Sequence, residues 1–380
     1  MKKVLLFTEW YAPGYKAGGP VQSLLTLVAT LKNEYSINIV TGNKEYLSDT
    51  PYHGVEPDTW LQAEQNVRII YLSQKNKNFA SIKKIVKEAK PDVVYLNSMY
   101  SLYFTIIPAL LLKDKTKIKT VLAPRGMLSE GSLSVKPLKK KIFFFIIHIL
   151  KVFKNTIFHA TSKQEETDIR KKFKTNSVCF APNIPSVPLE KVNSLKKEIE
   201  KLNLLTVARI APEKNILYAL EVLSNIQCEI HYTLIGPVYN ATYWKECEMK
   251  IKQMPKNIQI QFLNALPPAE IEKHYQTNHV FFLPSTGENF GHAIFNSLAN
   301  GRPVVISDKT PWQAHQEKNG VYSSSLDKQK NFVNTIHHLA AFNQEEFDTL
   351  CENSLNFAQA YLEKSESKVK YNQLFGSCTF

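Results

Sequence analysis

The sequence has few of the features that mark secreted, metal-binding or membrane-spanning proteins. It contains only 5 cysteines in 380 residues, and none of them forms a CxxC pair. A disulfide framework or a zinc site is therefore not expected, and a reducing compartment fits this cysteine usage. The longest apolar run, Ile142 to Leu150, is interrupted by His148 and is far shorter than the ~20 residues of a membrane span.

Several functional motifs are also missing. The GxGxxG fingerprint and the GxxxxGK[ST] loop do not occur, which argues against a dinucleotide cofactor and against a P-loop ATPase. HExxH, GxSxG and EF-hand patterns are absent as well. Lys2 and Lys3 precede only four apolar residues, Val4–Phe7. That run is too short for a signal-peptide core and is expected to form a first strand.

Charge is unevenly distributed along the chain. The net charge is +13, yet residues 1–185 hold 28 basic and 14 acidic residues, whereas residues 186–380 hold 19 and 20. An anionic partner is therefore expected to meet the first half of the chain.

The order of elements predicts two α/β domains, as the length of 380 residues does on its own. Short apolar runs alternate with helical patterns, which is typical of parallel sheets covered on both faces. The expected domains are residues 1–182 and 189–363, with a proline-rich linker at 183–188 and a tail at 364–380 that packs back on the first domain. The expected strands are Val4–Phe7, Ile37–Thr41, Val67–Leu72, Asp92–Leu96, Lys119–Ala123, Ile157–Ala160, Val178–Ala181, Leu202–Ala208, Ile230–Ile235, Ile258–Phe262, Val280–Leu283 and Pro303–Ile306.

Three loops carry the residue types of an anion-binding site. Gly287 and Glu288 follow a predicted strand, and a helix is expected to begin near Phe290 or Gly291, where free backbone N–H groups suit a phosphate. Glu288 could instead simply cap that helix. Arg209 and Lys214 follow another strand end, which suits a diphosphate but also fits a solvated loop.

The third loop lies in the first half. Gly18 and Gly19 precede Pro20, a suitable first helical residue, and make another open helix amino terminus. Because ligands of doubly wound sheets bind outside the carboxyl ends of the strands, the two halves are expected to face each other across a cleft.

These motifs together resemble family 4 retaining glycosyltransferases. The resemblance rests on a GGP loop after the first strand, R-x4-K-N after the first strand of the second half, and PS-x-x-E-N-F-G-H followed by G-x-PV. It runs from Val4 to about residue 365. It implies the GT-B fold: two Rossmann-like, doubly wound parallel-sheet domains facing across a cleft.

The resemblance also implies roles for the second half. Arg209 and Lys214 would bind the donor diphosphate, and Glu288 would hold a hydroxyl of the donor sugar. The second glutamate of the family's E-x7-E motif, which usually holds the ribose, is replaced by Asn296. Asparagine still hydrogen-bonds to hydroxyls but lacks the charge. The remaining donor-side residues implied are Asn289, Phe290 and Gly291, through their backbone amides, and Gly19.

The first half departs from the family pattern at two positions. Asn97 stands where many members have a histidine in the D-V-V-x-x-H stretch, and Arg125 stands at the place of a second histidine on the catalytic side. Asn97 and Arg125 are therefore catalytic candidates beside Glu288. Arg125 would either contact donor phosphates or an anionic acceptor, or simply anchor its loop.

The chemistry expected is hexosyl transfer from a UDP- or GDP-linked sugar, with no cofactor. No clear carboxylate nucleophile is present, so departure and attack are expected on one face, with the leaving diphosphate stabilised by Arg209, Lys214 and the helix terminus. No DxD pattern occurs, so no metal is expected at the diphosphate. The acceptor would be a glycan or a polyprenyl-diphosphate-linked sugar, in surface polysaccharide assembly.

Lys139, Lys140 and Lys141 adjoin the long apolar run and suggest contact with a membrane. Lysines would meet anionic headgroups and the phenylalanines of this stretch would dip below them, so the protein would be cytoplasmic and peripheral on the inner face. An internal helix with solvated ends explains the same residues.

Two other functions remain open at this point. A GT-B relative with another reaction, such as a sugar-nucleotide epimerase, would share most of these motifs. The basic first half would also suit a nucleic-acid binder. However, no recognisable nucleic-acid-binding module appears, and no nucleic-acid partner is expected.

Overall fold

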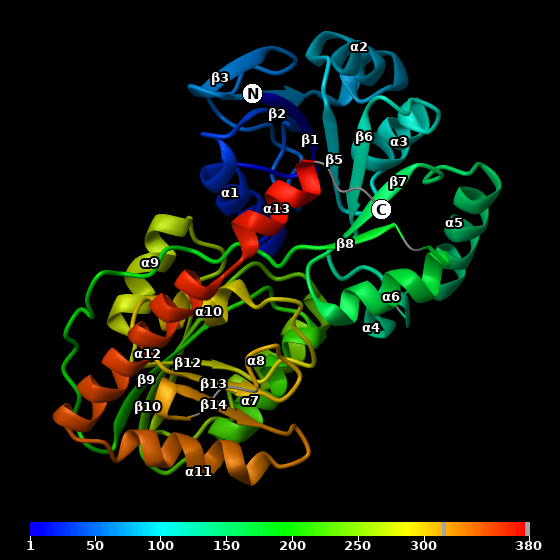
Figure 1. Cartoon of the computed structure of the whole chain (residues 1–380). Helices are drawn as coiled ribbons and strands as arrows, with labels where there is room; N and C mark the ends of the chain where they lie inside the picture. The colour runs from blue at the N-terminus through cyan, green and yellow to red at the C-terminus, as the bar shows by residue number, and fades with distance from the viewer. Residues whose placement is uncertain (135, 176, 314–316, 377–380) are drawn as a thin grey trace. The chain divides into compact units, whose positions relative to one another are not determined.

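The computed structural model describes residues 1–134, 136–175, 177–313 and 317–376, which form two compact units (Figure 1). The first unit comprises Met1–Ile184 and the described part of the carboxyl-terminal segment that begins at Glu366. The second unit is Pro185–Ser365. Each unit contains one sheet covered by helices.

The first unit is built on an eight-stranded sheet with the order β3-β4-β2-β1-β5-β6-β7-β8. All neighbouring strands are parallel except β3, which pairs antiparallel with β4 at one edge. The strands are β1 (Lys2–Phe7), β2 (Tyr35–Gly42), β3 (Trp60–Glu64), β4 (Val67–Leu72), β5 (Val93–Asn97), β6 (Lys119–Ala123), β7 (Thr156–Ala160) and β8 (Val178–Phe180).

Helices cover both faces of this sheet because its strands are apolar on both sides. Leu5 and Phe7 of β1 pack into one core with α2, α3 and α6, whereas Val4 and Leu6 pack into the other with α1 and α13. The helices are α1 (Gly19–Leu31), η1 (Gln74–Asn76), α2 (Phe79–Ala89), η2 (Leu102–Ile106), α3 (Ile107–Leu112), α4 (Glu130–Ser134), α5 (Pro137–Ile149), α6 (Lys163–Phe173) and α13 (Ser367–Phe375).

Helix α13 belongs to the first unit although it comes from the end of the chain. Its Tyr371, Leu374 and Phe375 are buried against the sheet. Lys368 Nζ lies 2.7 Å from Glu34 Oε1, and Asn372 donates a hydrogen bond to the same carboxylate at 2.6 Å. The last helix is thereby fixed to the segment that follows α1.

The second unit is built on a six-stranded, fully parallel sheet with the order β11-β10-β9-β12-β13-β14. Gly236, which follows β10, has a φ of 150°, and a Cβ there would lie only 1.9 Å from the carbonyl oxygen of Ala208. Glycine is thus required where these two loops touch. The strands are β9 (Lys201–Val207), β10 (Glu229–Ile235), β11 (Ile258–Phe262), β12 (Val280–Leu283), β13 (Val304–Ser307) and β14 (Val321–Ser324).

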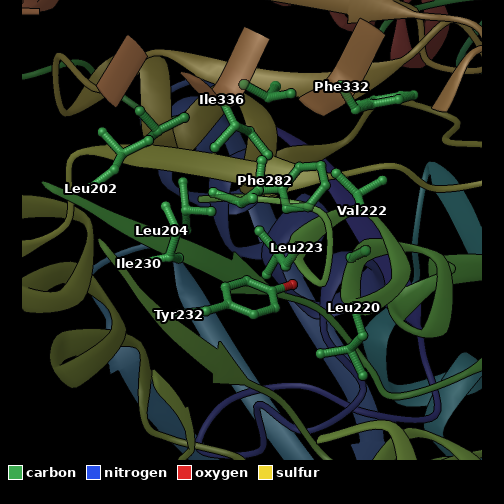
Figure 2. Close-up of a cluster of buried hydrophobic side chains, with 14 of the residues drawn as sticks. Leu202, Leu204, Leu220, Val222, Leu223, Ile230, Tyr232, Phe282, Phe332 and Ile336 are labelled. Carbon is green, nitrogen blue, oxygen red and sulfur yellow. The ribbon is translucent and has the colours of Figure 1, made fainter. Parts of the chain in front are cut away.

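Two apolar cores flank this second sheet. One holds Tyr232, Phe282 and Phe332 together with leucines of β9 and α7 (Figure 2). The other holds Phe295 of α10 and the fully buried Trp312. The helices are η3 (Pro212–Lys214), α7 (Ile216–Leu223), α8 (Ala241–Ile251), α9 (Pro268–Thr277), α10 (His292–Ala299), η4 (Glu317–Asn319), α11 (Gln329–Ala340) and α12 (Gln344–Lys364).

The fold class predicted from the sequence, two doubly wound parallel-sheet domains, is confirmed. Every predicted strand is present within two residues of its expected bounds, and β3 and β14 are additional. None of the helices in the described parts of the chain is long and apolar enough to cross a membrane.

Candidate functional site

The candidate site of the second unit lies at the point where the winding of its sheet reverses. The chain runs outward from β9 through β10 to β11, then returns to place β12 on the other side of β9. Arg209 and Lys214 follow β9, and Glu288 follows β12. Since the carboxyl ends of adjacent parallel strands meet at one edge, these residues are brought to the place where such sheets bind ligands.

The structure brings Lys214 and Glu288 into direct contact. Lys214 Nζ lies 2.5 Å from Glu288 Oε1, and their side chains are only 16% and 11% exposed. The two loops are joined by further bonds: Thr286 N donates to Glu213 O at 2.9 Å, and Asn215 Nδ2 donates to Pro284 O at 3.0 Å. Two segments about 75 residues apart thus form one rigid platform.

Arg209 lies on the same platform but nearer to solvent. Its guanidinium is 3.4 Å from Glu213 Oε1 and lies over the ring of Tyr239 at 5.1 Å. Tyr239 carries no motif and was not expected from the sequence. Together these contacts orient the guanidinium without burying it.

Helix α10 begins one residue later than expected, at His292. Gly291 precedes it with a φ of 78°, and a Cβ there would lie 2.9 Å from Ile294 Cδ1, so glycine is needed. Gly291 is the N-cap residue, and no side chain caps the helix. Glu288 therefore does not cap α10, and its carboxylate is paired with Lys214 instead.

The turn before α10 is held by Trp312, which follows β13 and packs in the same core as α10. Trp312 Nε1 donates to the carbonyl oxygen of Phe290 at 2.5 Å, and the two rings pack edge to face. Asn289 lies in the same turn. The first backbone N–H groups of a helix have no partner within the helix, so the start of α10 presents amides to a ligand.

Asn296 lies one turn into α10 and contacts two other segments. Its Oδ1 accepts a hydrogen bond from Ser186 Oγ at 2.7 Å, and it also hydrogen-bonds with Tyr275. Asn296 therefore connects α10 to the segment that enters the second unit. Neither partner was expected from the sequence.

The first unit has an equivalent reversal between β1 and β5. Gly19, the first residue of α1, follows β1, and Asn97 ends β5. Asn97 is only 2% exposed. Arg125 follows the next strand, β6, and has a φ of 57°, which is unusual for a residue with a side chain.

The guanidinium of Arg125 is held by four side chains. Its Nε donates to Asn97 Oδ1 at 2.8 Å, its Nη2 donates to the Tyr95 hydroxyl at 2.9 Å, and its Nη1 donates to Asn183. Tyr371 of α13 hydrogen-bonds with it as well. This geometry favours Arg125 as an anchor of its loop over Arg125 as a ligand contact.

The buried histidine beside this network is neutral. The Tyr95 hydroxyl lies 2.8 Å from His159 Nδ1, and His159 Nε2 lies 2.8 Å from Ala181 O. A carbonyl can only accept, so Nε2 carries the proton and Nδ1 accepts from Tyr95. Burial, together with the nearby Arg125, lowers the pKa of His159 to about 3.

Comparison with protein families identifies the second unit. Residues 189–343 match the family model of the glycosyl transferases group 1. The second unit is thus similar to group 1 glycosyltransferases over most of its length. Its match covers Arg209, Lys214, Glu288 and Asn296, which is the platform described above.

Similarity to known proteins extends over the whole chain. An uncharacterised 41.2 kDa protein in the cps region of Klebsiella pneumoniae is 22% identical over 288 residues, 72% of this chain and 76% of that protein. HepE of Anabaena, solved with UDP and glucose, has a TM-score of 0.68 at 15% identity, covering 98% of both chains. WaaG, a glycosyltransferase involved in lipopolysaccharide biosynthesis, has a TM-score of 0.66 at 12% identity, covering 98% of this chain and all of that one. The likeness in structure shows the GT-B fold, and with the family match it supports glycosyltransferase activity.

The first unit contains a cavity of about 480 Å³ that the sequence did not reveal. Glu9 and Trp10 follow β1, Lys44 and Tyr46 follow β2, and Lys77 follows β4, so the cavity opens at the carboxyl ends of three strands. The rings of Trp10 and Tyr46 meet edge to face at 4.9 Å. Burial raises the pKa of Glu9, and the charge of Lys77 opposes that shift.

One group of potential metal ligands lies away from the platform. Atoms of Glu200, Cys228 and His337 lie within 4.8 Å of one another at the amino ends of β9 and β10. Burial raises the pKa of Cys228 to about 11, which favours the thiol over the thiolate that binds metals. That the expected transfer reaction needs no metal ion stays a prediction.

The three lysines expected on the membrane or acceptor side do not lie together. Lys139 and Lys141 are exposed on α5. Lys140 points the other way: its ammonium donates to Ser132 O and lies 5.4 Å from the ring of Tyr100. Lys140 thus belongs to the packing of α5 against its own unit.

Proposed function

We propose that this protein is a retaining glycosyltransferase that transfers a hexosyl unit from a UDP- or GDP-linked sugar to a glycan or lipid-linked acceptor. Surface polysaccharide assembly, on the cytoplasmic side of the membrane, is the proposed setting. The Lys214–Glu288 pair beside the start of α10 carries this proposal. The fold shared with HepE, whose structure holds UDP and glucose, supports it.

The platform offers a separate group for each part of the donor. Lys214 and Arg209 supply positive charge for the diphosphate, and the first amides of α10 supply neutral donors. Glu288 pairs with Lys214 at the platform centre, and its carboxylate would accept a hydrogen bond from a sugar hydroxyl. Donor binding would draw Lys214 towards the phosphates while Glu288 stays beside the sugar.

The proposed transfer takes place on one face of the sugar. The bond between the anomeric carbon and the diphosphate oxygen breaks, and the bond to the acceptor oxygen forms on the same side. The acceptor proton passes to the departing diphosphate. Arg209, Lys214 and the α10 amides would stabilise the charge that develops on that group.

A thermal-shift screen of UDP-, GDP- and dTDP-sugars tests donor binding directly. A donor at 100 times its Kd stabilises the protein by about 2.7 kcal/mol, which shifts the Tm measurably. We expect a rise with one nucleotide class. If none of these donors changes the Tm, the proposal is wrong.

Two product measurements test the reaction. With the donor from the screen and an acceptor glycan, NMR of the new linkage should show the anomeric configuration of the donor, and EDTA should leave the rate unchanged. Inverted configuration would exclude the retaining mechanism, and loss of rate with EDTA would exclude metal independence. An epimerised sugar-nucleotide without transfer would point to the alternative reaction.

The cavity beside Trp10 is the proposed site of the acceptor sugar. Aromatic faces with a few charged groups at strand ends suit a small polar ligand. Trp10→Ala should raise the acceptor KM about tenfold while the donor Kd stays unchanged. An unchanged acceptor KM would place the acceptor elsewhere.

A further inference from the structure

Helix α5 has two apolar faces, and only one of them is used inside the protein. Phe143 packs on Tyr100 with ring centroids 5.0 Å apart, and Phe144 packs on Phe173 at 6.0 Å. Ile147 is the one buried residue of the helix. This inner face fixes α5 to the first unit. The outer face carries large apolar side chains that are about half exposed or more: Leu138 70%, Ile142 53%, Phe145 66%, Ile146 49% and Ile149 59%.

The outer residues form a continuous stripe. At about 100° per residue, these five positions fall within roughly 100° of the helix circumference, which is the width of a buried helix face. Single exposed apolar residues are ordinary in soluble proteins, whereas a contiguous stripe marks an interaction surface. Of the phenylalanines at 143–145, only Phe145 lies on it, which corrects the expectation that all of them face outward.

Positive charge borders the stripe on both sides. On the helix circumference, Lys139 lies at one border of the stripe and Lys141 at the other, and both are exposed. From Lys136 to Lys154 the chain contains six lysines and no acidic residue. Figure 1 shows α5 at the periphery of the first unit, near α4 and α6.

We propose that the outer face of α5 docks on an anionic lipid bilayer. The apolar stripe would enter the interface to a depth of ~5–10 Å, and the bordering lysines would meet the headgroups. A second copy of this chain fits poorly, because it would bring lysines against lysines. Docking is independent of the transferase reaction, and its test needs no turnover.

Vesicle co-sedimentation of the full chain tests this proposal. We expect binding to vesicles with about 30% phosphatidylglycerol and at least tenfold weaker binding to pure phosphatidylcholine. Raising the salt from 0.1 M to 0.5 M should weaken binding several-fold without abolishing it, because salt screens the lysines but not the stripe. Binding that ignores lipid charge, or no binding at all, would overturn the proposal.

Two variants of α5, each with a matched control, test the apolar stripe and the bordering lysines separately. Phe145→Glu, and the double variant Lys139→Glu with Lys141→Glu, should each weaken vesicle binding at least tenfold, since one lysine near an anionic surface is worth about fivefold. Helix α8 and the residue that follows it offer matched controls in the second unit: Met249→Glu, at a residue that is 58% exposed, and Lys245→Glu with Lys252→Glu. These controls should bind like the wild type.

Retained Tm and donor binding in each variant show that the protein is folded. If the α5 variants bind vesicles as well as the α8 controls do, another surface docks and the proposal is wrong. A wild-type dimer that Phe145→Glu converts to a monomer, without vesicle binding, would assign the stripe to a second copy and equally overturn it.

Discussion

The two units place polar residues at the same point of their sheets but use them differently. In the second unit, one of the three ammonium N–H groups of Lys214 donates to Glu288, and one carboxylate oxygen of Glu288 accepts that bond. In the first unit, Arg125 uses all three of its guanidinium nitrogens as donors to Asn97, Tyr95 and Asn183.

This difference separates a binding platform from a structural anchor. A charged pair with spare donors and acceptors can still bind phosphates and hydroxyls, whereas an arginine whose donors are taken inside its own unit can only hold that unit together. The left-handed backbone at Arg125 fits the second case, because such strain persists only where surrounding contacts fix it. Substitutions in the two units should therefore affect different measurements.

Glu288→Gln should give the largest effect of all. The amide keeps the shape and a hydrogen bond to Lys214 but removes the charge, so we expect kcat to fall about 100-fold or more. The Tm should change by a few degrees at most, because Glu288 does not cap α10. Steady-state kinetics and a melting curve check both values. A Glu288→Gln enzyme that turns over normally but melts early would make Glu288 structural.

Lys214→Ala should weaken donor binding by roughly 1.5–3 kcal/mol, the value of a charged hydrogen bond. Calorimetry with the nucleotide-sugar measures this as a 10- to 100-fold higher Kd. Lys245→Ala, at an exposed lysine of α8, is the control and should bind as the wild type does. Wild-type affinity in Lys214→Ala would remove Lys214 from the donor site.

The sequence predicted the sheets because buried parallel strands are nearly continuous apolar runs, such as Val280–Leu283. It did not predict β3, whose residues Trp60–Glu64 lie at the sheet edge and are mostly exposed. It did not predict β14 either, because Val321–Ser324 is short and half polar. Strand pairing, rather than local composition, makes these two segments strands.

The platform was predictable in part for a similar reason. Loops that follow adjacent parallel strands must meet, so Lys214 and Glu288 could be placed in one site. The partners of Arg125 could not be predicted, because Tyr95, Asn183 and Tyr371 come from distant segments and carry no motif. The inward turn of Lys140 likewise depends on how α5 packs.

Arg125→Leu should mainly lower stability, whereas Glu288→Gln should mainly lower kcat. It leaves the acceptors Asn97 and Asn183 without their donor in a largely buried place, so we expect a loss of about 2–4 kcal/mol in unfolding free energy. Donor affinity in the second unit should not change. Arg170→Leu, which removes a partly exposed pair with Glu166, is the control and should cost about 1 kcal/mol or less. Normal stability with lost transfer would instead make Arg125 a ligand contact.

Acid should destabilise the first unit over a wider pH range than the second. The pKa of His159 is about 3 when folded, against an ordinary 6.5, and burial lowers the pKa of His279 in the second unit to about 4. Each group favours the folded state above pH 6.5, and that contribution is lost as the pH falls to the folded pKa, by ~1.4 kcal/mol per pH unit. Chemical denaturation at several pH values measures the slope.

His159→Gln isolates that effect. Glutamine can still donate to Ala181 O and accept from Tyr95, but it does not titrate. The slope of stability against pH between about 6 and 3 should therefore become smaller. His231→Gln, at an exposed histidine beside Glu229, is the control for the same substitution outside the buried network. An unchanged slope in His159→Gln would mean that other groups cause the acid sensitivity.

Asn296 should show the smallest effect, because it is both a candidate donor contact, like Lys214, and a structural hydrogen-bond partner, like Arg125. If it replaces a ribose-binding glutamate, Asn296→Ala should raise the donor KM about three- to tenfold, the value of one neutral hydrogen bond, with kcat nearly unchanged. Asn296→Glu restores an acceptor for the ribose and for Ser186 Oγ, so it should bind the donor at least as well as the wild type. Ser186→Ala is the matched control: it removes the structural bond to Asn296 but not the contact to the donor. Should Ser186→Ala and Asn296→Ala both lower the Tm equally while the donor KM stays normal, Asn296 would be an anchor like Arg125, and the platform would end at Gly291.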